Sequence, residues 1–133
     1  MQVVAQRGVG INLIVPRKTD HPLVDMAGHA YFEELLQAGV QIFAYEAGLL
    51  HAKTMSVDDS IAFIGSSNFD IRSFSLNFEV NLLLYGREAT RGLRKHQMEY
   101  LRDSAGIDLL QWQKRSLLKH TTNDVAKLFS PLL

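Results

Sequence analysis

The chain has 133 residues, 47% of them hydrophobic and 21% charged, which is the composition of one globular domain with a core of moderate size. Its 14 basic and 14 acidic residues give a formal net charge of zero, so an anionic substrate has to be held by a local cluster of side chains rather than by a global field. The absence of cysteine excludes disulfides, thiolate metal sites and thiol nucleophiles, and no apolar run reaches the roughly 20 residues of a membrane span, so the chain by itself is expected to be soluble.

The first third of the chain predicts alternating helices and strands. Residues 1–8 read as the last turns of a helix, and residues 11–15 as a buried strand. Apolar residues then recur at helical spacing from Asp20, which can cap the helix, to Gly39, which can end it. Residues 40–45 predict a second strand. This order is that of a βαβ unit, in which a right-handed crossover joins two parallel strands.

A hairpin, a further strand and a helix are predicted next. Residues 50–57 and 61–65 read as two strands joined by a polar turn. Residues 77–85 alternate between apolar and polar side chains, and residues 87–102 have the periodicity of an amphipathic helix. The expected fold class is α/β, with a mixed sheet flanked by helices, and residues 1–133 are expected to form a single domain.

Polar side chains that suit phosphate chemistry gather around the hairpin. Strand side chains alternate, so His51 and Lys53 share a face. A neutral imidazole beside an ammonium suits attack on a phosphodiester, because the imidazole can act as nucleophile or proton carrier while the ammonium neutralises the non-bridging oxygens. Ser66 and Asn68 can donate to phosphate oxygens. Glu79, on the polar side of a later strand, can accept from one ring nitrogen of His51 and fix its tautomer.

Other residues near this cluster have competing explanations. Gly65 lets another group approach the backbone closely. Asp58, at the end of the histidine strand, braces the turn more readily than it acts directly. Arg72 can contact a headgroup phosphate or pair with Asp70 or Glu79.

Outside the cluster, packing is the preferred interpretation of two further features. His21 and His29 lie in or beside the first long helix, where capping and packing explain them. The tail from Asp108, with Trp112 and Lys114, suits either a membrane surface or a helix that closes the core, and closing the core is favoured.

The spacing of the cluster resembles the signature of the phospholipase D superfamily, H-x-K-x4-D-x6-G-S-x-N followed by a glutamate. The matching positions are His51, Lys53, Asp58, Gly65, Ser66, Asn68 and Glu79. The segments DHPLV at 20–24, YFEELLQAGVQIFAYEAGLLHAKT at 31–54 and SNFDIRSFSLNFEVNLLLYG at 67–86 resemble the second catalytic half of bacterial cardiolipin synthases. The likeness spans essentially the whole chain.

The resemblance implies a phospholipase D-like fold and phosphatidyl transfer between two phosphatidylglycerol molecules, which yields cardiolipin and glycerol through a phosphohistidine intermediate. It implies no metal and no cofactor, and it places the full-length enzyme at the bacterial cytoplasmic membrane. His51 would be one of two catalytic histidines, Lys53 and Asn68 would bind the phosphate, and Ser66 would support the same phosphate. Glu79 would orient His51, and Asp58 completes the catalytic motif.

The chain departs from the family pattern in one respect, since members carry two such motifs and this chain carries one. None of its other histidines is followed two positions later by lysine; they are His21, His29, His96 and His120. Two imidazoles are needed because one attacks while the other protonates the leaving alkoxide. We therefore expect the chain to be the C-terminal half of a longer two-motif enzyme. In two-motif relatives the histidine of the second half is usually the general acid, so the resemblance implies this role for His51. The partner of the chain would be an N-terminal half or a second copy of it.

Two other functions stay open from the sequence. Two copies of the chain could form a homodimeric phosphodiesterase or nuclease of the same superfamily, although a net charge of zero argues against nucleic acid as a partner. The chain could also be an inactive module that binds a phosphate or a lipid headgroup without turnover.

Overall fold

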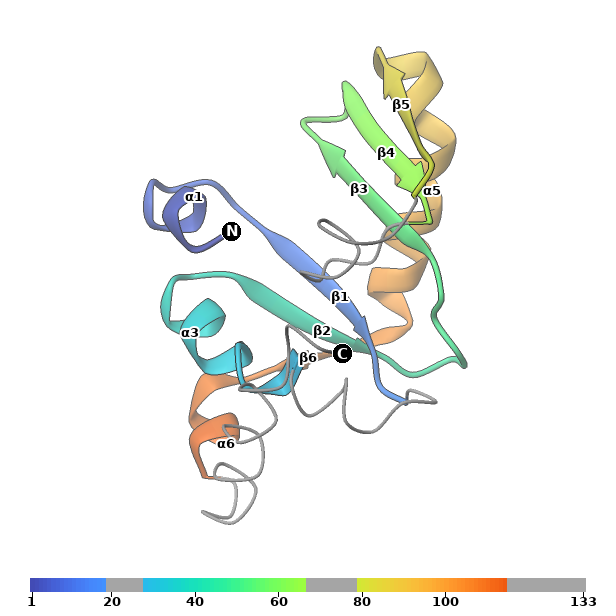
Figure 1. Cartoon of the computed structure of the whole chain (residues 1–133). Coiled ribbons are helices and arrows are strands. Elements are labelled where there is room, and N and C mark those ends of the chain that lie inside the picture. Colours follow the sequence, from blue (N-terminus) through green and yellow to red (C-terminus); the bar gives the residue numbers. More distant parts are fainter. Residues whose placement is uncertain (19–27, 67–78, 115–133) are drawn as a thin grey trace. The chain divides into compact units, whose positions relative to one another are not determined.

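A computed structural model describes residues 1–18, 28–66 and 79–114 of the chain. The chain divides into two compact units, one formed by Met1–Leu49 with Asp103–Leu133 and the other by Leu50–Arg102. Each unit contains a three-stranded sheet and at least one helix (Figure 1). The expected α/β class is confirmed. The strands are divided between two separate three-stranded sheets. That residues 1–133 form a single domain stays a prediction.

The first unit holds a mixed sheet in the order β1-β2-β6. Strand β1 is parallel to β2, as expected of a βαβ unit, and β6 is antiparallel to β2. The elements of this unit are α1 (Gln2–Gln6), β1 (Asn12–Pro16), α3 (Phe32–Gln37), β2 (Gln41–Tyr45), β6 (Ser104–Ile107) and α6 (Leu109–Gln113). Strand β6 was not predicted from the sequence, because SAGI is short, contains glycine and has no clear alternation.

Helix α3 ends where the sequence predicts. Gly39 has a φ of +93°, and the amide of Val40 donates to the carbonyl of Leu35 at 3.0 Å, which is the bond that closes a helix ending in a left-handed residue. The predicted N-terminal part of this helix, including its cap at Asp20, lies outside the described residues.

The core of the first unit is aromatic and aliphatic. Its buried members are Phe32, Val40, Ile42 and Trp112. The ring centroids of Phe32 and Trp112 lie 5.0 Å apart, and the imidazole of His29 lies 4.9 Å from the first and 5.3 Å from the second. Packing as the role of His29 and of Trp112 is thereby confirmed.

The second unit is an antiparallel sheet in the order β3-β4-β5, covered on one face by a helix. Its elements are β3 (Lys53–Val57), β4 (Ile61–Gly65), β5 (Asn81–Tyr85) and α5 (Arg87–Arg102). The turn between β3 and β4 places two consecutive residues in the left-handed region, Asp58 with a φ of 48° and Asp59 with a φ of 52°. Aspartate tolerates this region, and a hairpin turn of this kind matches the twist of the strands.

Within the described residues, no helix has both the length and the apolar character needed to cross a membrane.

Candidate active site

Four of the six predicted site residues lie where the strand ends line up at one end of the second unit's sheet, which we call the edge of the sheet. They are His51, Lys53, Ser66 and Glu79. Lys53 is the first residue of β3, Gly65 the last of β4 and Asn81 the first of β5, and the register pairs Lys53 with Gly65 and Gly65 with Asn81. This edge is where the lower ends of the three green and yellow strands meet in Figure 1. His51 lies two residues before Lys53. The predicted strand, residues 50–57, contained His51, but β3 begins only at Lys53.

His51 and Lys53 are in direct contact. The Lys53 Nζ atom lies 2.8 Å from His51 Nε2 and donates to the backbone carbonyl of His51 at 2.9 Å. An ammonium group can only donate hydrogen bonds, so a charged Lys53 beside a neutral ring takes Nε2 as its acceptor and leaves the ring proton on Nδ1. The lone pair of Nε2 is the one that would attack phosphorus or accept a proton.

Ser66 joins the end of β4 to the chain that leads into β5. Its hydroxyl donates to the Glu79 carboxylate, and the amide of Val80 donates back to Ser66 Oγ at 3.0 Å. The amide of Ser66 donates to the carbonyl of Val80, also at 3.0 Å. These bonds fix the position of Glu79 relative to the strand end. The hydrogen bond expected from His51 to Glu79 stays a prediction.

Glu79 acts on Lys53 through its charge. Partial burial lowers the pKa of Lys53 from its ordinary value of 10.5, and the Glu79 carboxylate opposes this by raising it. The site therefore brings together an imidazole, an ammonium and a carboxylate, with the carboxylate helping to keep the ammonium charged.

Gly65 is required by a close approach, as the sequence predicts. A Cβ atom built on Gly65 would lie 1.9 Å from the side-chain oxygen of Asn81 and 2.7 Å from the backbone carbonyl of Val80. The Asn81 side chain can rotate away, but the Val80 carbonyl belongs to the backbone and accepts from Ser66. Glycine at this position thus lets β4 and β5 meet at the edge where the site forms.

Asp58 lies away from this edge. It occupies the turn after Val57, at the other end of β3 from Lys53. Its neighbour Asp59 makes the ion pair of the turn, with Asp59 Oδ1 lying 2.9 Å from Arg94 Nε. This placement suits the turn-bracing interpretation of Asp58, and a direct catalytic role stays a prediction.

Two other predicted residues, Asn68 and Arg72, lie outside the described residues.

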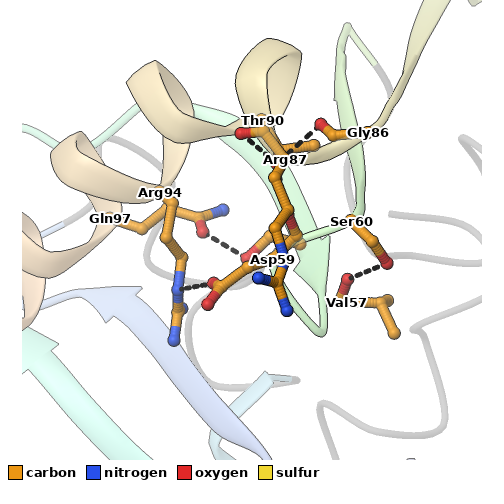
Figure 2. Close-up of polar contacts among 9 residues, drawn as sticks. Val57, Asp59, Ser60, Gly86, Arg87, Thr90, Arg94 and Gln97 are labelled. Atoms are coloured by element: carbon orange, nitrogen blue, oxygen red, sulfur yellow. Dashed lines mark hydrogen bonds and ion pairs between the residues drawn. The ribbon is translucent and has the colours of Figure 1, made fainter.

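Helix α5 supports β3, the strand that carries Lys53. This support was not predicted from the sequence. The hydroxyl of Ser56 donates to Gln97 Oε1 at 2.6 Å, and Gln97 Nε2 donates to Thr54 Oγ1 at 3.2 Å. Figure 2 shows Thr90, Arg94 and Gln97 on α5, and Asp59 at the turn. The only signal in the sequence is that Gln97 occupies an apolar position in the periodicity of α5.

In the ranges 1–18, 28–66 and 79–114, no three histidine, aspartate or glutamate side chains are grouped so as to hold a metal ion. The absence of a metal from the reaction stays a prediction.

Three comparisons with known proteins bear on this geometry. A family model described as "Cardiolipin synthase, PLD-like domain" matches residues 1–101. A cardiolipin synthase of Geobacillus thermodenitrificans is 42% identical over all 133 residues, and cardiolipin synthase A of Yersinia pseudotuberculosis is 43% identical over 129 residues, 97% of the chain. The chain spans 26% of the length of each of these two relatives.

The fold has a solved counterpart. The crystal structure of Nuc, a phospholipase D family member from Salmonella typhimurium, matches with a TM-score of 0.68 at 16% identity and covers 80% of this chain and 69% of that one. At that identity the likeness concerns the fold, while the family follows from the sequence matches. The chain belongs to the family of cardiolipin synthase PLD-like domains, and it has a phospholipase D fold.

Proposed function

We propose that the chain supplies one of the two catalytic halves of a phosphatidyltransferase that makes cardiolipin from two phosphatidylglycerol molecules. The observation that carries this proposal is the contact between His51 Nε2 and the Lys53 ammonium at the edge of the sheet, with Glu79 close enough to raise the pKa of Lys53. The name of the relatives supports the substrate class. The chain spans 26% of their length and carries one motif, and a partner half is proposed to supply the second.

The reaction takes place in two displacements. In the first, an imidazole nitrogen attacks the phosphorus of one phosphatidylglycerol, the bond from phosphorus to the headgroup oxygen breaks, and the second histidine gives a proton to the departing glycerol. In the second, a hydroxyl of another phosphatidylglycerol attacks the phosphohistidine and gives its proton to that second histidine, and the bond from phosphorus to nitrogen breaks. His51 takes the role of proton carrier, for which its ring has to carry a proton on Nε2 as well as on Nδ1 before the first displacement, and the partner half supplies the nucleophile.

Lys53 acts on the phosphate rather than on the proton. Its ammonium pairs with the non-bridging oxygens and neutralises the charge that develops on them in the transition state. Asn68 and Ser66 are proposed to donate to the same oxygens, with Glu79 orienting the His51 ring. The partner half is either the N-terminal part of a longer chain or a second copy of this one, and the working location is the bacterial cytoplasmic membrane.

The test is formation of cardiolipin from phosphatidylglycerol in mixed micelles, with and without a polypeptide that carries the first motif. His51→Ala is compared with His96→Ala, which removes an exposed histidine of α5 that pairs with Glu99. We expect the combined halves to be active, His96→Ala to retain that activity, and His51→Ala to lose about 1,000-fold, within the range for a general acid. Equal turnover by the native and His51→Ala chains would overturn the assignment.

The same assay separates the alternatives. Turnover by the chain alone, abolished in His51→Ala, would mean that two copies complete the site. Binding of inorganic phosphate without turnover, even with the partner half present, would favour the inactive binding module.

A further inference from the structure

One side of helix α5 carries a row of positive charge. Arg87, Arg91, Lys95, Met98 and Arg102 are spaced by four, four, three and four residues, so they lie one above the other along the helix. We call these five residues the basic stripe. At 1.5 Å per residue the stripe is about 22 Å long.

The stripe lies beside the face of α5 that packs on the sheet. Thr90 and Gln97, about 110° around the helix from the middle of the stripe, bond to the turn and to β3. All five stripe residues are exposed, and Met98 is 48% exposed. The helix therefore packs through the face that carries Thr90 and Gln97, and it leaves the stripe exposed.

The four basic side chains of the stripe are not held in ion pairs within the described part of the chain. Arg94, which lies off the stripe, is the basic residue of α5 that pairs with the turn, through Asp59. The two acidic residues of α5, Glu88 and Glu99, lie beside the stripe, and Glu99 contacts His96 at 3.1 Å. The whole chain has a net charge of zero, so these four positive charges form a local field that is balanced elsewhere.

We propose that the basic stripe is a docking surface for an anionic phospholipid bilayer, with α5 lying along the membrane plane. Four cations in a row can each contact a lipid phosphate, and the exposed Met98 between them can enter the acyl boundary. A nucleic acid fits less well, because an apolar side chain in the row gains nothing from contact with phosphates. The choice of a lipid over other polyanions rests on the proposed function, whereas the stripe itself shares no residue with the His51 site.

The test compares two triple variants of the 133-residue chain that remove the same charge. Arg91→Gln, Lys95→Gln and Arg102→Gln together remove three charges of the stripe, and Arg7→Gln, Lys18→Gln and Lys114→Gln together remove three exposed charges elsewhere. Binding is measured by co-sedimentation with vesicles of phosphatidylcholine alone or mixed with either phosphatidylglycerol or phosphatidylserine. The second anionic lipid separates attraction to a charged surface from occupancy of the active site by phosphatidylglycerol.

We expect the native chain to bind both kinds of anionic vesicle, to bind neutral vesicles weakly, and to be released by salt. The stripe variant should lose about 100-fold in its partition coefficient, since each basic residue near an anionic surface contributes about fivefold, while the control variant should lose little. Equal losses in the two variants, or equal binding to neutral vesicles, would overturn the proposal. Tighter binding to duplex DNA than to anionic vesicles at the same salt would also overturn the choice of a lipid.

Failure of this proposal can be told apart from failure of the proposed function. In micelles where a large excess of neutral detergent dilutes the phosphatidylglycerol, turnover with the partner half does not depend on an anionic surface, so the stripe variant should retain it. Selective vesicle binding without cardiolipin formation would sink the proposed function and leave the docking surface. Cardiolipin formation without selective vesicle binding would overturn the docking surface and leave the proposed function standing.

Discussion

At the scale of single residues, the site depends on how Lys53 is kept charged. Its Nζ atom donates to the ring and to the carbonyl of His51, while the carboxylate of Glu79 raises the pKa that burial lowers. A lysine that loses its proton could no longer pair with a phosphate oxygen, and its contact with Nε2 would change from donation by an ammonium to donation by a neutral amine. Glu79 is thus expected to extend the alkaline range over which the site can bind phosphate.

Replacing Glu79 tests this electrostatic role. Glu79→Gln removes the charge that raises the pKa of Lys53, so Lys53 should lose its proton at a lower pH than in the native chain, and the alkaline limb of phosphate binding should move down with it. The titration of Lys53 can be followed by NMR at its Cε atom, which requires no turnover. Ser66→Ala serves as the control, since it removes the bond to Glu79 but keeps the carboxylate. An unchanged or higher pKa in Glu79→Gln would contradict the expectation.

Replacing Gly65 tests whether the site needs β4 and β5 to lie this close together. Gly65→Ala would place a Cβ atom 2.7 Å from the Val80 carbonyl, so the backbone has to move and the bonds of Ser66 with Val80 and Glu79 are displaced. We expect a loss of about 1–3 kcal/mol in the free energy of unfolding, as for other overpacked sites, together with a loss of turnover.

The matched control is Gly92→Ala. No atom lies within 4 Å of a Cβ built on Gly92, which is an exposed position of α5. Alanine there should add about 0.5–1 kcal/mol of stability, because it favours the helix more than glycine does. Urea unfolding of both variants gives the comparison, and a Gly65→Ala chain as stable and active as the native one would show that the strands can separate without harm.

At the scale of elements, α5 and the β3–β4 hairpin support each other through polar bonds. Thr90 is fully buried, and its hydroxyl has one proton and three carbonyl oxygens within reach, of which that of Asp59 is the nearest at 2.6 Å. Arg94 also reaches Asp59, through an ion pair whose side chains are 43% and 64% exposed. These contacts hold the turn against the first half of the helix, as Figure 2 shows.

The burial of the two contacts predicts different contributions to stability. Thr90→Val keeps the shape of the side chain but leaves the carbonyl of Asp59 without its donor, and we expect a loss of about 1–3 kcal/mol in the free energy of unfolding. Arg94→Gln removes an exposed ion pair and should cost about 0–1 kcal/mol. Urea titrations of the two variants supply the measurement. A larger loss for Arg94→Gln than for Thr90→Val would show that the ion pair, not the buried hydroxyl, fastens the turn.

At the scale of the whole molecule, one of the two compact units is formed by two separate stretches of the chain. Leu50–Arg102 forms one unit with the candidate site, and the residues on both sides of it in the sequence form the other. The chain passes between the units twice, after Leu49 and after Arg102, and the second passage leads from α5 to β6, which pairs with β2 of the first unit. The chain also spans only 26% of the length of the Geobacillus thermodenitrificans cardiolipin synthase, so complementation by a partner half is the experiment that belongs to this scale.

Much of the local structure could be predicted from the sequence. Helical periodicity is read over a few turns, so α5 was predicted with its observed bounds, and the strands β1, β2, β3 and β4 were placed to within a few residues. Strand β5 begins at Asn81 rather than at residue 77, and residues 77 and 78 lie outside the described residues. The role of Gly65 was also predicted, because a glycine between a strand and polar residues signals a close backbone approach.

The sequence by itself determined the fold class, the hairpin with its two aspartates in the turn, and the spacing that brings His51 and Lys53 to one sheet edge. These features follow from periodicity and turn chemistry, which act between residues close in the chain. The tertiary structure alone decided that β6 joins β2, that Ser66 bonds to Glu79, and that Gln97 supports β3. Each of these joins residues 13 or more positions apart, and such bonds form only where packing has already brought the two segments together, which no local pattern specifies.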